Sequence, residues 1–375
     1  MKPTTHKKTV QHVVSVSGGK DSTATLLLAL ARVPRENITA IFCDTGNEHE
    51  AVYAYLDYLE LALDIKIQRL KADFSDNIAR KRLFIANDKR TRREYERVPR
   101  VDAAGNVIYQ KNNDGSIRMQ AVVKNGVTDL QPVPRMRKVA GRKVRWTNKA
   151  KRRALAVLNP TGNPFLDLCL WKGRFPSRKA QFCTEELKRN LAVAFQLKLM
   201  DEGYKVVSWQ GVRRDESLAR RNAKRMETVG GGLYIFRPLV DWTAQQVFDY
   251  CATQKIQPNP LYLQGMGRVG CMPCINARKL EIREIATRFP EHIARIDEWE
   301  RLVSLASKRG FSTFMHKGPA DKVVTSDRCT FENARIDKVV HWSRTTHGGK
   351  KMDLLTNQSD VNGCSSSYGL CEQAA

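Results

Sequence analysis

The chain has 375 residues and a formal net charge of +25, from 64 Lys and Arg against 39 Asp and Glu. This length accommodates an α/β core with a smaller second unit. Apolar runs stay well below the ~18 residues of a membrane span, and no signal-type stretch follows residues 1–8, so we expect a cytoplasmic protein without a membrane partner. Nine cysteines, an odd number, argue against a disulfide framework and favour metal, cluster or redox roles.

The positive charge is concentrated in one segment. Residues 81–153 hold 21 Lys and Arg against 6 Asp and Glu, so 21 − 6 = +15 of the total lies there. Such a field attracts polyanions, and nucleic acid is the expected partner; a solvated charged surface is the alternative. Turn residues at 112–115 and 125–126 separate alternating segments, which predicts a basic β-hairpin or meander over 101–145, with a flexible loop as the alternative.

Taken in chain order, hydrophobic periodicity predicts a βαβ unit followed by a second set of elements. The first set is a strand at 12–16, a helix at 21–32, a strand at 38–43, a helix at 50–63 and a short strand near 65–67. Later come a strand at 205–209, a helix after Trp242 capped by Thr243 or Asp241, and helices over 277–308 interrupted at Pro290. From about residue 345 the chain is expected to be irregular.

These elements predict an α/β fold with a doubly wound, mostly parallel, Rossmann-like sheet. The fold carries a basic β-rich insertion and a C-terminal helical region that bears cysteines. We assign residues 1–80 and 155–275 to the nucleotide-binding domain, 81–154 to the insertion, and 276–375 to the helical region and tail.

A glycine-rich turn joins the first strand to its helix. Its residues are Ser15, Ser17, Gly18, Gly19, Lys20, Asp21 and Ser22. Glycines let backbone N–H groups approach an anion, the helix N-terminus adds unpaired donors, and Lys20 adds a full charge. The spacing differs from that of a Walker loop or a dinucleotide fingerprint. The turn predicts a phosphate site, and a generic glycine turn is the alternative.

Two later segments end predicted strands at the same edge of the sheet. In the first, Asp44, Thr45 and Gly46 lead to Glu48, and the two carboxylates are suited to Mg²⁺ or a ribose. In the second, Gly211, Arg213, Arg214 and Glu216 follow strand 205–209, and the arginines are suited to bidentate phosphate or sulfate binding.

Three cysteines have the spacing of a metal or cluster site. Cys271 and Cys274 form a CxxC pair, and Cys183 lies upstream. Thiolates two residues apart can face one metal, and cysteine-rich sites favour iron–sulfur clusters or zinc. A structural zinc and inert buried thiols are the alternatives to a cluster.

Together these motifs resemble the phosphoadenosine phosphosulfate (PAPS) reductase family within the adenine-nucleotide α-hydrolase superfamily. The shared parts are the SGGKDS loop, the strand end DTGNE, the FCTEELK segment beginning at Phe182, the GVRRDES segment, the segment PLVDW, NPLY and GCMPC. They span roughly residues 12–280, without the insertion and the tail. The SGGKDS loop itself resembles the PP-loop of ATP pyrophosphatases, which split ATP between the α and β phosphates.

The resemblance also implies a 4Fe-4S cluster. Adenylylsulfate reductases hold one with a Cys-Cys pair and a downstream CxxC, but Phe182 stands where the first cysteine of the pair would be. Three ligands therefore carry over, Cys183, Cys271 and Cys274. The fourth comes from Cys169, Cys364, Cys371 or a group that is not cysteine, or else one iron is open and can bind or activate sulfur.

The resemblance implies an enzyme that uses ATP and Mg²⁺, with Asp21 or Asp44 as the ligand of the metal. Lys20, Asp21, Arg213 and Arg214 are the expected catalytic residues of an ATP pyrophosphatase that adenylylates an acceptor for sulfur transfer. The basic segment makes nucleic acid the expected acceptor, as in the DNA phosphorothioation enzymes of the PP-loop type, and a cysteine desulfurase is a candidate sulfur donor.

Three other functions stay open. A sulfonucleotide reductase would use a tail cysteine, Cys364 or Cys371, to attack sulfur and release sulfite. A nucleotide-gated nucleic-acid-binding protein would need no catalysis. ATP sulfurylase-like transfer to sulfate would not need the cysteines. The sequence leaves the oligomeric state open.

Overall fold

The computed structural model of the chain describes residues 9–90, 92–124, 127–315 and 331–346. A six-stranded sheet forms its centre, in the order β3-β2-β1-β8-β10-β9. The strands are β1 (Val10–Ser15), β2 (Ile38–Asp44), β3 (Ile67–Lys71), β8 (Lys205–Trp209), β9 (Met226–Gly230) and β10 (Leu233–Phe236). All neighbours pair in parallel except β9, which runs antiparallel to β10 at the edge. The predicted α/β fold with a mostly parallel sheet is confirmed.

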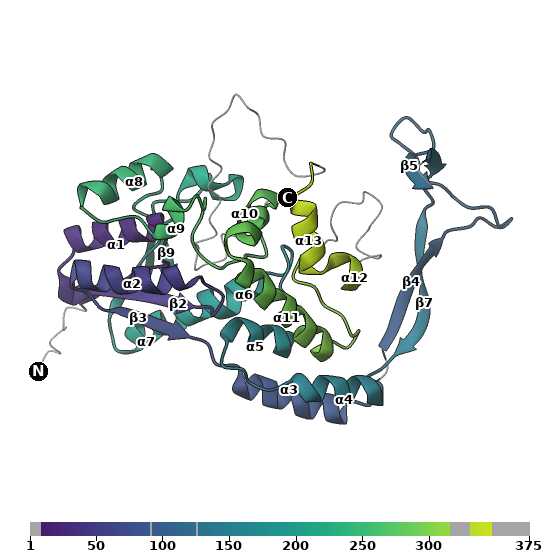
Figure 1. Cartoon of the computed structure of the whole chain (residues 1–375), viewed down its shortest axis with the longest axis horizontal. Helices are drawn as coiled ribbons and strands as arrows, with labels where there is room; N and C mark the ends of the chain where they lie inside the picture. The colour runs from purple at the N-terminus through teal and green to yellow at the C-terminus, as the bar shows by residue number, and fades with distance from the viewer. Residues whose placement is uncertain (1–8, 91, 125–126, 316–330, 347–375) are drawn as a thin grey trace, which may run out of the picture.

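Helices cover both faces of the sheet, as a doubly wound fold requires (Figure 1). Val14 packs with α1 (Lys20–Arg32), α2 (Glu50–Leu63) and α8 (Ala244–Thr253), whereas Val13 packs with α7 (Asn190–Asp201) on the opposite face. Because the strand order reverses between β1 and β8, the carboxyl ends of these two strands form the switch point where ligands of such sheets bind.

Most predicted boundaries agree with the structure within two residues. The predicted helix at 50–63 is confirmed, and Thr243 caps α8 by accepting a hydrogen bond from the Gln246 backbone. The short strand expected near 65–67 was misplaced, because β3 begins at Ile67 and runs to Lys71. The break at Pro290 is also confirmed, since α10 (Lys279–Arg288) ends just before α11 (Pro290–Ala306).

A second hydrophobic core lies beside the sheet and is mainly helical. Its helices are α3 (Ser75–Asn87), α4 (Asn148–Val157), α5 (Pro164–Lys172), α11 and α13 (Ile336–Ser343), with the short α12 (Phe331–Ala334) preceding α13. Glu300 of α11 is fully buried there and accepts hydrogen bonds from the backbone N–H groups of Phe314 (2.7 Å) and Ile336 (2.9 Å). Burial raises the pKa of this carboxyl to about 7.

The basic insertion forms two small antiparallel sheets. β4 (Arg92–Pro99) pairs with β7 (Met136–Val144), and β5 (Met119–Lys124) pairs with β6 (Val127–Pro132). The β-structure that the turn signals predict is confirmed, but it begins at Arg92 and not at residue 101. The segment 81–154 begins within α3 and ends within α4, whose buried side chains belong to the second core. Beyond these helices the insertion projects from the body as an arm (Figure 1).

Short elements lie between the longer ones. They are η1 (Arg35–Asn37), α6 (Phe182–Thr184), the π-helical turn η2 (Glu185–Arg189), η3 (Arg214–Glu216), η4 (Leu218–Arg220) and α9 (Pro260–Leu263). Among the described residues, no helix combines the length and apolar character needed to cross a bilayer.

Candidate functional site

The glycine loop is closed by its own hydroxyl groups at the start of α1. The Ser22 hydroxyl accepts a hydrogen bond from the Ser17 backbone N–H (3.0 Å) and donates one to the Gly19 carbonyl (2.9 Å). Gly18 has a φ of +72°, and a Cβ there would lie 3.0 Å from Val52 of α2. Glycine is therefore required both by the backbone conformation and by the close approach. The loop leads directly into α1, as a phosphate site at a helix N-terminus requires.

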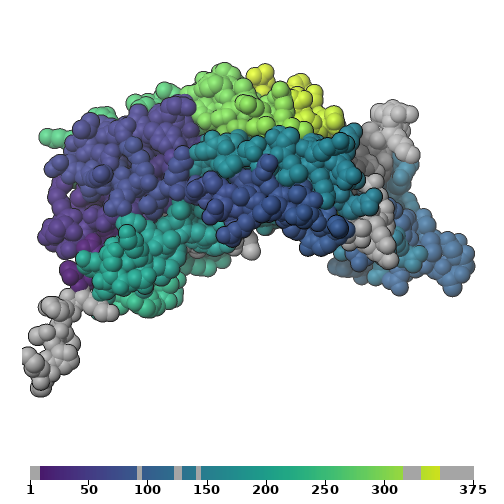
Figure 2. Space-filling view, turned by 90° about the horizontal axis from the view of Figure 1, so that it is seen from below, coloured from purple at the N-terminus to yellow at the C-terminus, as the bar shows by residue number. Residues whose placement is uncertain are grey.

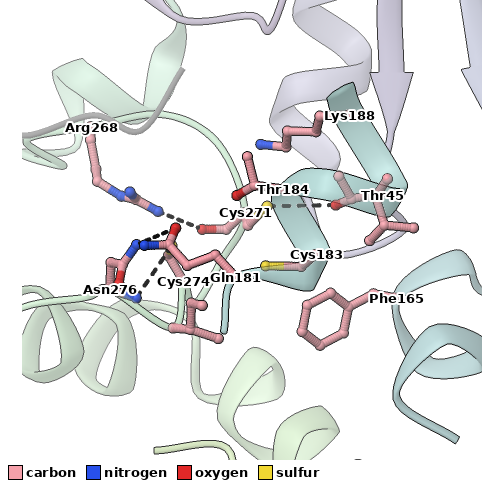
Figure 3. Close-up of a pocket in the computed structure, with 12 residues that line it drawn as sticks. Thr45, Phe165, Gln181, Cys183, Thr184, Lys188, Arg268, Cys271, Cys274 and Asn276 are labelled. Atoms are coloured by element: carbon pink, nitrogen blue, oxygen red, sulfur yellow. Dashed lines mark hydrogen bonds between the residues drawn. The ribbon is translucent and has the colours of Figure 1, made fainter. Parts of the chain in front are cut away.

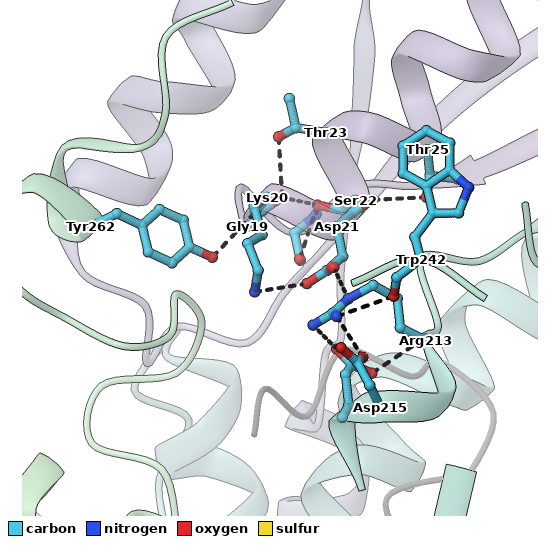
Figure 4. A network of polar contacts seen from close by, with 12 residues as sticks. Gly19, Lys20, Asp21, Ser22, Thr23, Thr25, Arg213, Asp215, Trp242 and Tyr262 are labelled. Atoms are coloured by element: carbon cyan, nitrogen blue, oxygen red, sulfur yellow. Dashed lines mark hydrogen bonds and ion pairs between the residues drawn. The ribbon is translucent and has the colours of Figure 1, made fainter. Parts of the chain in front are cut away.

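Lys20, Asp21 and Arg213 form a buried charge chain beside this loop (Figure 4). The Asp21 carboxylate lies 3.1 Å from the Lys20 ammonium and 2.5 Å from Nε of Arg213. Burial lowers the pKa of Lys20, and the neighbouring Asp21 partly offsets this effect. The ammonium also lies 5.8 Å from the ring centres of Phe248 and Tyr262. The cation is thus held in a desolvated position at the loop.

The structure brings Arg213, but not Arg214, to the loop. Arg213 is 1% exposed and also pairs with Asp215 (2.5 Å), so its guanidinium ties the end of β8 to α1. Glu216 is buried next to it and forms an ion pair with Arg220. Arg214 pairs with Asp241 at the surface. Of the two arginines predicted to be catalytic, Arg213 alone has a contact to Asp21.

Gly211 permits this close approach. A Cβ at Gly211 would lie 2.8 Å from the backbone carbon and oxygen of Asp21 and 3.0 Å from the Thr25 hydroxyl. These separations are shorter than any ordinary van der Waals contact, so a larger residue would force β8 and α1 apart.

Two residues of the NPLY segment support the loop, a role that the sequence did not reveal. The Tyr262 hydroxyl accepts a hydrogen bond from the Lys20 backbone N–H (3.2 Å), and the Asn259 side chain donates one to the Gly18 carbonyl (3.1 Å). The motif was visible in the sequence, but it follows the loop by about 240 residues and no local pattern connects the two.

The strand end after β2 lies on the other side of the switch point. Asp44 accepts hydrogen bonds through one carboxylate oxygen from the Gly46 backbone (2.9 Å) and the Tyr53 hydroxyl (2.8 Å). The Thr45 hydroxyl donates to Glu48 (2.6 Å), which is buried. Asp44 is half-buried, and the Gly46 and Tyr53 hydrogen bonds use the same one of its oxygens, whereas both oxygens of Asp21 face cations. Asp44 is therefore the better candidate ligand for Mg²⁺.

The CxxC segment is docked on this strand end. Glu48 and Cys271 form an antiparallel β-bridge, and the Met272 backbone N–H donates to the Asn47 carbonyl (2.7 Å). The Asn47 side chain donates to the Pro273 carbonyl (3.0 Å). Sγ of Cys271 lies 3.6 Å from the Thr45 hydroxyl. The cysteines are thus directly adjacent to the edge of the sheet where a nucleotide would bind.

Cys183, Cys271 and Cys274 line one pocket (Figure 3). Cys183 comes from α6, and the pair comes from the loop before α10. Burial, together with the neighbouring Cys274 and Cys271, raises the pKa of Cys183 to about 12. The backbone N–H of Asn276 lies 3.5 Å from Sγ of Cys274 and points at it. Three thiols in one buried pocket become thiolates only when a bound cation or cluster stabilises their negative charge.

Two cations border the same pocket, and sequence analysis assigned neither of them. Lys188 follows Cys183 along the chain and lies on the π-helical turn. Its pKa is raised, mainly by the nearby Cys271. Burial opposes the charge of Arg268, yet Cys274 and Glu281 raise its pKa. Arg268 pairs with Glu281 (2.8 Å) and donates to the Cys271 carbonyl (3.2 Å). Both cations therefore favour negative charge in the pocket.

Of the three cysteines that could supply a fourth ligand, Cys169 alone lies within the described residues. Cys169 is fully buried in the second core and is not among the residues that line the pocket. Phe182 is buried in the same core. Cys364 and Cys371 lie outside the described residues.

The fold and the site define a class of protein. It is an α/β protein with a glycine-rich loop at the switch point of its sheet and a cysteine-lined pocket beside the strand end that follows β2. A family model described as the phosphoadenosine phosphosulfate reductase domain matches residues 11–277. The chain belongs to this family, which confirms the resemblance seen in the sequence. The family is enzymatic.

Individual relatives span very different shares of the chain. An uncharacterized 37.8 kDa protein of Escherichia phage 186 is 43% identical over 372 residues, which cover 96% of each chain. An adenosine 5'-phosphosulfate reductase of Salinibacter ruber is 35% identical over 65 residues, 17% of this chain and 26% of the reductase. A crystal structure of a phosphoadenylyl-sulfate reductase from Candida auris aligns with a TM-score of 0.35 and 13% identity, covering 70% of this chain and 82% of that one.

Proposed function

We propose that the protein is an ATP pyrophosphatase that adenylylates an acceptor so that sulfur can be transferred to it. The observation that carries the proposal is the β-bridge between Glu48 and Cys271. It joins the nucleotide edge of the sheet to the cysteine pocket. An intact phosphate loop at one end of this edge supports cleavage of ATP, and cysteines at the other end support sulfur or redox chemistry.

The reaction needs charge stabilisation at the departing diphosphate. An acceptor oxygen attacks the α-phosphorus, the bond to the β-phosphate oxygen breaks, and pyrophosphate leaves; a sulfur nucleophile then displaces AMP. Lys20 and the backbone N–H groups of the loop would neutralise the leaving charge. Arg213 fixes the Asp21 carboxylate, and Asp21 in turn orients Lys20. Asp44 would hold Mg²⁺, which would supply positive charge to offset that of the phosphates.

The residues of the cysteine pocket fit an iron–sulfur cluster better than zinc. Tetrahedral zinc needs sulfur atoms about 3.8 Å apart. Within the described part of the chain, the group of three possible ligands whose atoms all lie within 4.8 Å of one another is His49, Glu291 and His292, and not the cysteines. Cys183, Cys271 and Cys274 would hold the cluster, which would supply redox or sulfur-binding chemistry.

The acceptor that we propose is nucleic acid, and a cysteine desulfurase is the proposed sulfur donor protein. The basic arm supports the first part of this proposal, because it lies on the same chain as the nucleotide site and carries an excess of cations.

Pyrophosphate release tests the ATP chemistry. With DNA or RNA present as the acceptor, the full chain should release pyrophosphate from ATP. Lys20→Ala should lose at least about 100-fold in rate, the size of effect seen when one preorganised charge-stabilising donor is removed. Lys66→Ala, which removes an exposed cation elsewhere, is the control. Equal rates in both variants would remove the pyrophosphatase proposal.

Anaerobic iron and sulfide analysis tests the cluster. Wild type should contain both elements and absorb near 400 nm, whereas Cys183→Ala should lose most of the iron. Cys251→Ala removes a cysteine that packs in the main core away from the pocket and serves as the control. Stoichiometric zinc without iron in the wild type would contradict the proposal.

A sulfonucleotide reductase is the second candidate, favoured by the partial match to adenosine 5'-phosphosulfate reductases. Against it, Arg213 is buried and already paired with three carboxylates, those of Asp21, Asp215 and Glu216, so it is not available to a phosphosulfate group. Sulfite formation from PAPS or adenylylsulfate, abolished by Cys364→Ser or Cys371→Ser, would reverse this ranking.

A further inference from the structure

The ribbon formed by β4 and β7 presents unpaired cations to solvent. Arg97, Arg100, Arg135, Arg137 and Lys138 are all exposed. Among the described residues, none of the five has an acidic partner within ion-pair distance, in contrast to the arginines of the body, which pair extensively. The charge of these five side chains is therefore not used to hold the described part of the ribbon together.

The register of the ribbon places like charges side by side. Arg97 is directly opposite Lys138, and Arg100 donates its backbone N–H to the Arg135 carbonyl (2.6 Å). Like charges opposite each other destabilise an antiparallel pair, and a ribbon that only had to fold would alternate their signs. A bound polyanion would remove this repulsion, so the arrangement indicates a surface shaped for a ligand with closely spaced negative charges.

The face of the ribbon that carries Arg97 and Lys138 also carries exposed apolar side chains. Tyr95 and Met136 are 67% and 45% exposed, and both point to the same side as Arg97 and Lys138, because residues two apart share a face of a strand. Mixed apolar and cationic groups suit a partner that offers base edges and methyl groups between phosphates.

The shape of the ribbon selects among nucleic acids. The major groove of B-form DNA, about 12 Å wide, admits a two-stranded β-ribbon. The corresponding groove of an A-form helix is too deep and narrow for side chains to read. Eight residues of β4 extend about 27 Å, enough to follow a groove across a duplex. The arm forms one end of an arch whose other end is the nucleotide-binding body (Figure 2).

We propose that the β4–β7 ribbon binds duplex DNA by entering its major groove. Arg97 and Lys138 on one face of the ribbon, and Arg100 and Arg135 on the other, would contact the phosphates that flank the groove. That this DNA is also the acceptor rests on the proposed function. The binding itself does not, since it requires neither ATP nor the cysteines.

The test compares two variants of the full chain, one that removes four cations from the arm and one that removes two cations from the body. The arm variant is Arg97→Ala, Arg100→Ala, Arg135→Ala and Lys138→Ala together. The control variant, Lys66→Ala with Lys198→Ala, removes exposed cations from the body. Fluorescence anisotropy measures binding to a 24-base-pair DNA duplex of mixed sequence, to the RNA duplex of the same sequence and to the single strand, each between 50 and 200 mM salt.

Each lost phosphate contact should reduce the salt slope by about 0.9, so loss of four contacts reduces it by about 3.6. The affinity of wild type should therefore fall about 100-fold more over this salt range than that of the arm variant. The control should behave as wild type, and duplex DNA should bind at least tenfold tighter than duplex RNA. Equal binding of both duplexes, tighter binding of the single strand, or an arm variant that matches the control would each overturn the proposal.

Pyrophosphate release without DNA, in which water takes the place of the acceptor oxygen, separates this proposal from the proposed function. The arm variant should keep the wild-type rate of this basal reaction, because its substitutions lie outside the nucleotide site. A chain that binds duplex DNA but releases no pyrophosphate either with or without DNA refutes the enzymatic proposal and leaves the ribbon assignment intact.

Discussion

Replacement of Gly211 by alanine tests whether the end of β8 positions the phosphate loop. The added Cβ would lie 2.8 Å from the backbone of Asp21, whereas ordinary contacts begin at about 3.4 Å. Relief of this clash requires β8 and the start of α1 to separate by roughly 3.4 − 2.8 = 0.6 Å. The displacement acts on Asp21, and hence on the ion pairs with Lys20 and Arg213.

Two effects of different size should follow. Overpacking at a tight contact costs about 1–3 kcal/mol of the free energy of unfolding. A shift of more than half an ångström in a charge-stabilising group should lower pyrophosphate release by about tenfold or more, since misplacement by 1 Å can cost about 100-fold.

Urea unfolding and pyrophosphate release measure the two effects, with Gly267→Ala as the matched control. A Cβ at Gly267 meets no atom within 4 Å, so this variant should behave as wild type. If Gly211→Ala unfolds and turns over ATP like Gly267→Ala, β8 does not position the loop and the geometric argument is wrong.

Three further predictions concern single side chains. Burial raises the pKa of Glu300 from 4.5 to about 7, so the folded protein holds this proton more tightly than the unfolded chain does. The free energy of unfolding should therefore fall by about 2–3 kcal/mol as the pH rises from 5 to 8. Urea titrations at several pH values measure this fall, and Glu300→Gln should flatten it. Tyr262→Phe removes the hydroxyl that accepts a hydrogen bond from the Lys20 backbone N–H. Measured in the absence of ATP, the free energy of unfolding should fall by about 1–3 kcal/mol. Arg213→Lys should lower pyrophosphate release more than tenfold while Arg214→Ala changes it less than twofold, and equal losses would contradict the assignment of Arg213 to the loop.

The sheet and the phosphate loop could be predicted because their signals are local. The apolar run before Ser17, the glycines and the helix that follows lie within twenty residues of one another, and hydrophobic periodicity marks each boundary. The β-structure of the insertion was predicted from its turn residues. Its start was misplaced, because Arg92 to Pro99 is too polar to show a strand pattern on an arm that is exposed on both faces.

The contacts that complete the site could not be predicted, because they join distant segments. Asn259 and Tyr262 reach the loop, and Cys271 pairs with Glu48, across more than 220 residues. Lys188 was within a motif that resembles the family, yet its place at the cysteine pocket depends on the π-helical turn, which has no sequence signature here. Arg214 was predicted together with Arg213 because adjacent arginines look equivalent in sequence.

The charge chain at the loop has a consequence for how ATP would bind. Lys20 is buried against Asp21, so the triphosphate must compete with this carboxylate for the ammonium. Arg213 is held by Asp21 and Asp215, and it would keep Asp21 neutralised when Lys20 moves to the phosphates. In this arrangement Arg213 contributes by fixing a carboxylate and not by contacting a phosphate.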